Sequence, residues 1–189
     1  MIVLDPSAQR FFEDLCRRFA AGQLGILPTD TLYGLSCAAD RREVVSRLFA
    51  LKHRSKAAAV VPPSIEAAEA MVEPSIRGRL AGLLEGYRGP YTTIWPVAPG
   101  GGGLAEELWS GGTVGLRLPD HWITEVAGRC GFPLVTTSAN LAGEPPLVDL
   151  ASLPPALARG LDFFVEAGRL EGPPSQVYDC RVEPPLRLR

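Results

Sequence analysis

Histidine and lysine are scarce in this chain. Among 189 residues there are two histidines, His53 and His121, and two lysines, Lys52 and Lys56. Two histidines so far apart in sequence do not suggest a metal site, and neither an H-E-x-x-H nor a G-x-S-x-G motif is present. An enzyme with this sequence would therefore depend on cations and hydroxyl groups rather than on a histidine base.

Cysteine pairs with metal-binding spacing are also missing. The four cysteines, Cys16, Cys37, Cys130 and Cys180, form no C-x-x-C motif. We therefore predict no metal site and expect reduced, mostly buried thiols.

Long apolar runs are absent as well. No run approaches the ~20 residues that a membrane helix needs. Acidic residues, beginning with Asp5, follow too closely on the N-terminus for a signal peptide. These features predict a cytoplasmic protein that does not associate with membranes.

The chain has no excess of positive charge. It carries 19 basic and 21 acidic residues, with a net charge of −2 and a pI near 5.7. Proteins that coat nucleic acid usually have a basic excess, so we expect tRNA or double-stranded RNA to bind weakly if at all. Of the basic residues 17 are arginine, so the two neighbouring lysines reflect either a composition bias or a site that needs a compact ammonium group.

The composition that remains is that of a globular domain. Hydrophobic residues make up 46% of the chain and charged residues 21%, with a mean hydropathy of +0.09. The 20 glycines and 18 prolines predict many turns. We expect a single domain that spans residues 1–189.

Short apolar runs alternate with helical patterns along the chain. Strands are expected at residues 24–28, 32–37, 57–61, 91–95, 113–118, 133–138, 162–167, 175–179 and 186–188. Helices are expected to begin at Asp5-Pro6, at Asp40 with Glu43 in capping-box spacing, at Ser64, at Asp120 and near residue 150. Because several strand connections are short, this order predicts an α/β (α+β) fold in which helices flank a twisted mixed β-sheet.

Short hydroxyl and amide side chains recur at the ends of expected strands. The segments PTDT (28–31) and TTSAN (136–140) could each bind a small polar ligand, and Lys52 and Arg54 could hold phosphates. Taken singly, such residues more often satisfy turns and helix ends. The glycine-rich segment 99–103 lacks the Lys-Ser/Thr of a P-loop, so we interpret it as a flexible surface loop.

Six segments, in this order, resemble one protein family. They are PTDTLYGLSCAA (28–39), LKHR (51–54), GPYTTIWP (89–96), TVGLRLPDH (113–121), PLVTTSANLAGEPP (133–146) and GPPSQVYD (172–179). From about Gly22 to its C-terminus the chain is similar to the YrdC-domain family of threonylcarbamoyl-AMP synthases. The K-x-R…S-x-N signature of that family is complete as Lys52, Arg54, Ser138 and Asn140. The resemblance implies a YrdC/RibB-like open three-layer architecture.

The resemblance also implies a reaction. Members of the family are nucleotidyltransferases that join L-threonine, bicarbonate and ATP into threonylcarbamoyl-AMP, with release of pyrophosphate, for the t6A modification of tRNA. The carbamate that attacks the nucleotide is already anionic, so the protein has to hold two anions together and neutralise charge. The implied requirements are ATP with Mg²⁺ as a substrate complex, no tightly bound metal or organic cofactor, and the t6A transferase machinery as a partner.

The same motifs imply individual roles. The residues implied for ATP binding, of which the first two are also implied to be catalytic, are Lys52, Arg54, Thr113 and Asn140. The residues implied for L-threonine binding are Thr31, Arg117, Ser138 and Ser175. Among them Arg117 is the natural partner for the amino-acid carboxylate.

The sequence departs from the family pattern directly after Arg54. The family usually continues with Pro, a polar or basic residue and Pro-Leu, whereas this chain reads Ser-Lys-Ala-Ala-Ala, and the expected polar position is Ala58. This departure leaves an alternative open, namely a divergent, non-catalytic YrdC-like protein that binds nucleotide or RNA. Carbamoyl transfer as in hydrogenase maturation is disfavoured because those YrdC domains belong to much larger chains.

Overall fold

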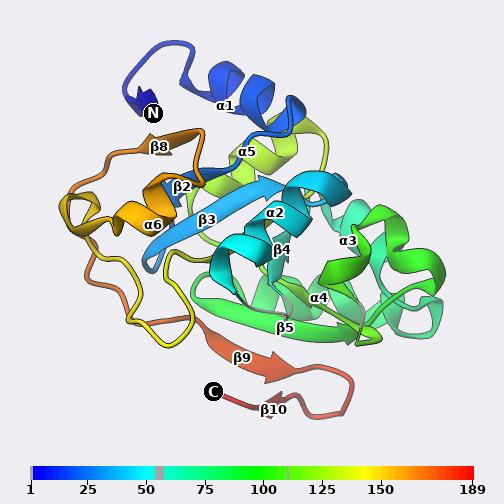
Figure 1. The fold of residues 1–189 in the computed structure, drawn as a ribbon. Coiled ribbons are helices and arrows are strands. Elements are labelled where there is room, and N and C mark those ends of the chain that lie inside the picture. The colour runs from blue at the N-terminus through cyan, green and yellow to red at the C-terminus, as the bar shows by residue number, and fades with distance from the viewer. Residues whose placement is uncertain (1, 54–57, 110) are drawn as a thin grey trace.

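A computed structural model of the protein describes residues 2–53, 58–109 and 111–189. Its centre is a mixed sheet of ten strands in the order β1-β8-β2-β3-β7-β4-β6-β5-β9-β10 (Figure 1). The strands are β1 (Ile2–Leu4), β2 (Gly25–Pro28), β3 (Tyr33–Ala38), β4 (Ala59–Val61), β5 (Tyr91–Pro96), β6 (Thr113–Leu116), β7 (Leu134–Ser138), β8 (Phe163–Val165), β9 (Gln176–Asp179) and β10 (Leu186–Arg187). The predicted α/β fold with a mixed sheet is confirmed.

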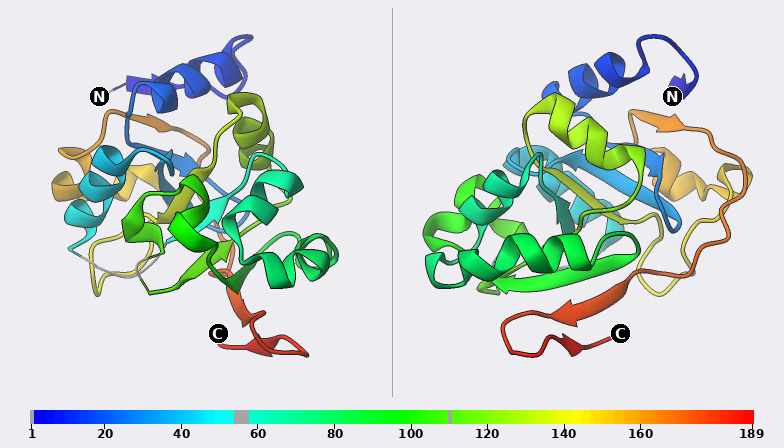
Figure 2. Two further views of the ribbon diagram at one scale, coloured as in Figure 1. Left: turned by 90° about the vertical axis from the view of Figure 1, so that its right-hand side faces the viewer. Right: turned by 180° about the vertical axis from the view of Figure 1, so that it is seen from behind.

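Helices cover both faces of this sheet. They are α1 (Phe11–Ala20), α2 (Arg42–Lys52), α3 (Ile65–Met71), α4 (Arg77–Gly86), α5 (Trp122–Cys130) and α6 (Pro155–Ala158). Helices α1 and α5 pack against each other at the end of the molecule that holds the N-terminus, and the β9–β10 hairpin lies at the opposite end (Figure 2). Within the described residues, none of the helices combines the length and the apolar character needed to cross a lipid bilayer.

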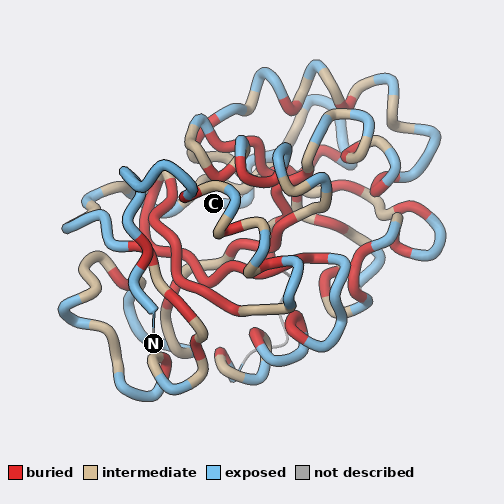
Figure 3. Tube along the Cα trace, turned by 90° about the horizontal axis from the view of Figure 1, so that it is seen from above, coloured by how far each residue is buried: buried red, intermediate tan, exposed pale blue. Residues whose placement is uncertain are grey.

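Side chains alternate between the two faces of each strand, so the buried apolar residues form two separate hydrophobic clusters, one on each face of the sheet. In β4, Val60 belongs to the cluster packed under α2, α3 and α4, whereas Val61 belongs to the cluster packed under α1 and α5. In β7, Val135 and Leu134 divide in the same way. Buried residues therefore follow the central strands (Figure 3), and the layers are helix, sheet and helix, as the resemblance implied.

One of the predicted helix starts is confirmed and one capping box is wrong. The Ser64 side chain accepts a hydrogen bond of 3.1 Å from the backbone N–H of Ala67 and caps α3. Helix α2 begins at Arg42, and its N-cap residue, Arg41, makes no side-chain capping bond. Asp40 and Glu43 therefore do not form the predicted capping box.

The cap residues predicted at Asp5 and Asp120 are also wrong, although the helix expected after Asp120 is present as α5 and ends at Cys130, as predicted. The Asp5 carboxylate instead accepts bonds from the backbone N–H and hydroxyl of Ser7, which closes a local turn, and α1 begins only at Phe11. At α5 the N-cap residue is His121, whose Nδ1 accepts from the backbone N–H of Ile123. At the first place Asp5 closes a turn instead of opening a helix, and at the second the neighbouring His121 takes the capping position.

The expectation of four reduced cysteines is wrong for one pair. Cys16 of α1 and Cys130 of α5 form a disulfide across 114 residues of sequence, with their Cα atoms 5.1 Å apart. Cys37 and Cys180 are free and buried, as expected. Burial raises the pKa of the Cys180 thiol to about 11, so this thiol stays protonated at neutral pH.

The glycine-rich segment lies at the surface at Pro99, Gly100 and Gly103, as predicted, but two of its glycines are closely packed. Gly101 and Gly102 both have positive φ angles. A Cβ atom at Gly102 would lie 2.5 Å from the Cα of Met71, and one at Gly101 would lie 2.1 Å from Nε1 of Trp109. The glycines are therefore needed for close packing against the end of α3 and against Trp109.

Candidate functional site

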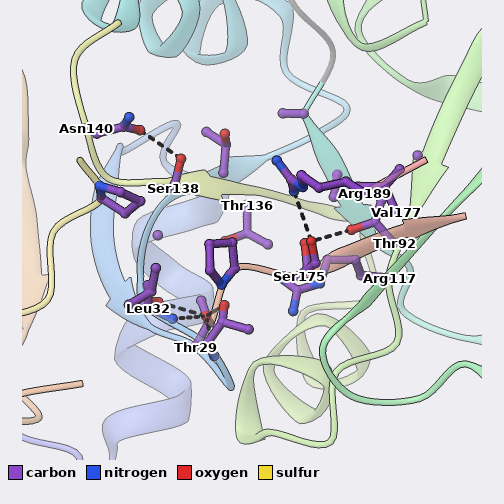
Figure 4. A pocket seen from close by; sticks show the side chains of 18 of the residues that line it. Thr29, Leu32, Thr92, Arg117, Thr136, Ser138, Asn140, Ser175, Val177 and Arg189 are labelled. Atoms are coloured by element: carbon purple, nitrogen blue, oxygen red, sulfur yellow. Dashed lines mark hydrogen bonds between the residues drawn. The ribbon is translucent and has the colours of Figure 1, made fainter. Parts of the chain in front are cut away.

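A cavity of about 410 Å³ lies over six neighbouring strands, β3, β7, β4, β6, β5 and β9 (Figure 4). Strand alternation places Gly34, Ala59 and Thr136, which line it, on the sheet face that also carries α1 and α5. The lining is rich in hydroxyl groups, among them those of Thr29, Thr31, Thr92, Thr113, Thr136, Ser138 and Ser175. The cavity is therefore a polar hollow on a rigid sheet.

Six of the eight predicted site residues meet at this cavity. They are Thr31, Thr113, Arg117, Ser138, Asn140 and Ser175. Lys52 is buried beside the cavity but is not part of its lining. Arg54 lies outside the described residues. The contacts that the resemblance assigned to each residue, with ATP or with L-threonine, stay predictions.

Glycine at position 34 keeps the cavity floor open. Strand pairing sets Gly34 opposite Ser138. A Cβ atom at Gly34 would lie only 2.6 Å from Oγ1 of Thr136 and 3.2 Å from Cγ2 of Thr29. Two strands and the turn before β3 can therefore present hydroxyl groups side by side only because this residue has no side chain.

The turn after β7 is held by the buried ammonium of Lys52. This side chain, at the end of α2, is 2% exposed. It donates to the backbone carbonyl of Ser138 and, over 2.9 Å, to Oδ1 of Asn140. Ser138 Oγ donates to the same oxygen over 2.7 Å, while Nδ2 of Asn140 donates to the carbonyl of Glu144. The oxygen of the Asn140 amide thus faces Lys52 and Ser138, which leaves its NH₂ group as the donor for a ligand.

The Arg117 guanidinium is paired with an aspartate that sequence reasoning missed. Nη2 of Arg117 donates to Oδ1 of Asp30 over 2.7 Å, and both side chains are nearly buried. Burial lowers the pKa of Arg117, and the negative charge of Asp30 opposes that shift. The only sequence signal was the position of Asp30 in PTDT, between Thr29 and Thr31, which both line the cavity.

Thr29 orders the turn that carries Thr31. The Thr29 hydroxyl donates to the backbone carbonyl of Leu32 over 2.7 Å and lies 3.0 Å from the hydroxyl of Thr31. It also accepts from the backbone N–H groups of Thr31 and Leu32. The predicted Thr31 hydroxyl is therefore fixed by a neighbour that was not predicted.

Ser175 is flanked by two residues that the sequence did not indicate. Its hydroxyl lies 3.2 Å from Oγ1 of Thr92, and its carbonyl accepts a bond of 3.0 Å from Nη2 of Arg189 (Figure 4). Thr92 and Arg189 both line the cavity. Thr92 lies within one of the family-like segments, whereas nothing distinguishes Arg189 from the other arginines of the sequence.

This arrangement suits anionic and polar ligands. Arg117 and Arg189 supply positive charge, hydroxyl groups supply donors and acceptors, and the described lining residues include no carboxylate. In the described part of the chain no group of three or more His, Cys, Asp or Glu side chains could hold a metal ion. The chemistry that such a site supports is binding, orientation and charge neutralisation.

The fold and the site define a three-layer α/β protein with a polar, arginine-containing cavity on its sheet. The Sua5/YciO/YrdC family model, described as "Telomere recombination", matches residues 17–189. The chain belongs to this family.

Relatives and solved structures agree with this assignment. A threonylcarbamoyl-AMP synthase of Xanthomonas axonopodis pv. citri is 36% identical over 189 residues, which cover 92% of this chain and 97% of that protein. A double variant of Sua5 from P. abyssi matches all of this chain with a TM-score of 0.87 and 23% identity. The same Sua5 complexed with L-threonine matches with a TM-score of 0.80 and 24% identity. This chain spans 59% and 56% of those two longer chains, and at these identities they show a common fold.

Proposed function

We propose that the protein is an L-threonylcarbamoyladenylate synthase, a nucleotidyltransferase that forms threonylcarbamoyl-AMP and pyrophosphate from L-threonine, bicarbonate and ATP. The observation that carries the proposal is the convergence of four family-like segments on one cavity. Residues Thr31, Thr113, Ser138 and Ser175 come from distant parts of the sequence, yet all line it. The names of the curated relatives, at 36% identity over most of the chain, support the same activity.

The reaction needs no strong base from the protein. The amine of L-threonine and bicarbonate combine to a carbamate and water, and a carbamate oxygen then attacks the α-phosphorus of ATP. Pyrophosphate leaves with the electron pair of the broken P–O bond. Both reactants are anions, so their approach depends on positive charge and on fixed hydrogen-bond donors.

The cavity contains groups of this kind for both ligands. Arg117 and the hydroxyls of Thr31, Ser138 and Ser175 would hold the amino acid. The donors for the nucleotide would be Arg189, Thr113, the NH₂ group of Asn140 and, from the resemblance, Arg54. Mg²⁺ would arrive on the triphosphate as part of the substrate.

Lys52 would act mainly by positioning Asn140. Its ammonium is buried and bound to Ser138 and Asn140, and direct contact with phosphate would require it to leave these acceptors. This arrangement supports a role in fixing the turn that the nucleotide meets. The phosphate contact implied by the resemblance stays a prediction.

The wider setting is proposed from the family. We infer that residues 1–189 act as one domain in the cytoplasm and that the product passes to the t6A transferase machinery. Threonylcarbamoyl-AMP is a mixed anhydride and hydrolyses readily, so rapid consumption by a transferase fits its chemistry. We expect the protein to bind RNA weakly, because its net charge of −2 gives no general attraction for phosphate groups.

The decisive experiment is a reaction with all substrates. The purified protein is incubated with ATP, Mg²⁺, bicarbonate and L-threonine, and pyrophosphate and the adenylate are both measured. We expect both products in equal amounts, and neither when L-threonine or bicarbonate is left out. Binding of ATP without pyrophosphate release would favour the non-catalytic alternative, for which the alanines Ala58 and Ala59 in the cavity wall are the structural argument.

A further inference from the structure

Asp30 is buried at the cavity without contributing to its lining. Its neighbours Thr29 and Thr31 both line the cavity, whereas the Asp30 carboxylate is turned to Arg117, with Oδ1 2.7 Å from Nη2. The side chains of Asp30 and Arg117 are 9% and 7% exposed. Desolvation makes a charge pair this well buried costly to form, and the cost is repaid only when the geometry is good and the remaining donors and acceptors find partners.

The pair makes only one of the two hydrogen bonds that it could make. Nε of Arg117 and Oδ2 of Asp30 are both buried and have no partner. These two atoms are the other half of the side-on fork in which Nε and Nη2 bind both oxygens of one carboxylate. The bond of 2.7 Å between Nη2 and Oδ1 restricts the orientation of the Arg117 guanidinium.

Elimination shows which end of Arg117 remains for a ligand. Nη2 is bound to Asp30, and Nε is buried on the same edge of the guanidinium. Arg117 nevertheless lines the cavity. Nη1, together with the second N–H of Nη2, is therefore the end that remains for a ligand, and an anion there would meet a guanidinium whose orientation Asp30 restricts.

Charge balance gives Asp30 a second reason to be present. Arg117 and Arg189 both line the cavity, and the positive charge of Arg189 acts unfavourably on Arg117. Without Asp30 the buried Arg117 guanidinium would have no opposite charge beside it and would be free to turn away from Arg189. The negative charge of Asp30 thus offsets both the unfavourable effect of burial on the Arg117 charge and the repulsion between Arg117 and Arg189.

We propose that Asp30 is a positioning residue that fixes Arg117 so that its Nη1 end binds the carboxylate of the amino-acid substrate. The inference rests on the proposed function, because it takes L-threonine as that substrate. It adds a residue that acts through Arg117 and makes no contact with substrate itself.

The test compares Asp30→Asn, which keeps a hydrogen-bond acceptor but loses the charge, with the wild type. Asp179→Asn is the matched control, because Asp179 is also 9% exposed and also lies 2.7 Å from an arginine, Arg181, which does not line the cavity. The KM values for L-threonine and ATP are measured, together with inhibition by L-threoninamide, which lacks the carboxylate. We expect the KM for L-threonine to rise about ten- to hundredfold in Asp30→Asn, the range of a lost charge-assisted contact.

The other readouts separate positioning from folding. The KM for ATP, the inhibition constant of L-threoninamide and the melting temperature should stay near the wild-type values, and Asp179→Asn should change none of the three constants. An unchanged KM for L-threonine, an equal loss for L-threonine and L-threoninamide, or failure of Asp30→Asn to fold would overturn the inference. A wild-type protein that neither binds nor turns over L-threonine would overturn the proposed function and this inference together.

Discussion

The ammonium of Lys52 lies 2.9 Å from Oδ1 of Asn140, and this contact decides which way the Asn140 amide faces. Ser138 donates to the same oxygen, so its acceptor capacity is used within the protein. A lysine from the end of α2 thereby sets the donor that a loop after β7 presents to the cavity. Lys52, Ser138 and Asn140 of the K-x-R…S-x-N signature thus form one hydrogen-bonded unit in the structure.

The first prediction concerns this unit. Lys52→Met keeps much of the side-chain volume but removes one donor from the carbonyl of Ser138 and one from Oδ1 of Asn140, each of which keeps a second donor. A hydrogen bond to a charged group contributes about 1.5–3 kcal/mol, so the free energy of unfolding should fall by about that amount, and ATP affinity should fall at least about tenfold. Urea unfolding and calorimetric titration with ATP measure the two effects.

A neighbouring substitution provides the control. Arg42→Met lies on the same helix with a 73% exposed side chain and should change neither quantity. Wild-type ATP affinity in Lys52→Met would show that the orientation of Asn140 does not matter for the nucleotide.

The second prediction concerns Arg189. Its guanidinium lines the cavity and holds the carbonyl of Ser175. Arg189→Ala should therefore weaken ATP binding by about tenfold or more, because a charge-assisted contact contributes about 1.5–3 kcal/mol, with little change in melting temperature. Arg159→Ala, whose exposed side chain belongs to a residue outside the cavity lining, serves as the control in the same calorimetric titration. Equal losses in both variants would indicate a long-range effect of charge instead of a contact.

Residues whose local pattern matches their final environment could be predicted from the sequence. The strands at 24–28 and 133–138 are short apolar runs, and in the structure they are central strands buried by helices on both faces. Helix α4 was not predicted, because its three glycines weaken the helical pattern and only Leu80 and Leu84 are buried. Asp5 was misread because an aspartate satisfies a turn as readily as a helix N-terminus.

Only the site residues that belong to recognisable sequence motifs could be predicted from the sequence. Thr113 and Ser175 were found because they belong to family-like segments, and both line the cavity. Asp30 lies in such a segment too, but its value comes from the position of Arg117, 87 residues away. The Cys16–Cys130 disulfide likewise depends on the packing of α1 against α5. Contacts of this kind depend on tertiary structure, so they cannot be inferred from the spacing of residues that are close in sequence.

The third prediction compares two glycines. In Gly34→Ala the new Cβ would lie 2.6 Å from Oγ1 of Thr136, and such overpacking costs about 1–3 kcal/mol. In Gly82→Ala, within α4, the new Cβ meets nothing within 4 Å, and alanine favours a helix over glycine by about 1 kcal/mol. Urea unfolding should therefore show opposite signs for the two variants. Destabilisation by both would mean that α4 is held by something other than helix propensity.

The fourth prediction concerns pH. Burial lowers the pKa of His121, and the charge of Asp30 only partly opposes the shift. The folded protein thus binds a proton at His121 less readily than the unfolded chain, whose histidine pKa is about 6.5. The contribution of this group to stability should be complete above pH ~6.5 and should decline as the pH falls below that value, until the folded-state pKa is passed.

His121→Asn isolates this contribution. Asparagine can still cap α5 but does not titrate. Between about pH 7.5 and pH 5.5, the free energy of unfolding from urea melts should fall more steeply in the wild type than in the variant. Parallel profiles would assign the pH dependence to other groups.

The last prediction concerns substrate choice. Thr31, Ser138 and Ser175 place hydroxyl groups along the cavity, with Arg117 nearby for a carboxylate. A site that hydrogen-bonds a substrate hydroxyl loses those bonds when the hydroxyl is missing, whereas one missing methyl group costs only about 1–3 kcal/mol. We therefore expect L-threonine to be used well and L-serine less well, while L-valine, which has a methyl group in place of the hydroxyl, should be nearly inert.

Pyrophosphate release with each amino acid, at equal concentration and with saturating ATP and bicarbonate, tests this order. The hydroxyl and the methyl group are removed one at a time, so the two ratios separate polar recognition from packing. If the hydroxyls of Thr31, Ser138 and Ser175 line the amino-acid site, the ratio of threonine to valine exceeds the ratio of threonine to serine. Comparable rates for valine and threonine would mean that these three residues serve the nucleotide or the sheet instead.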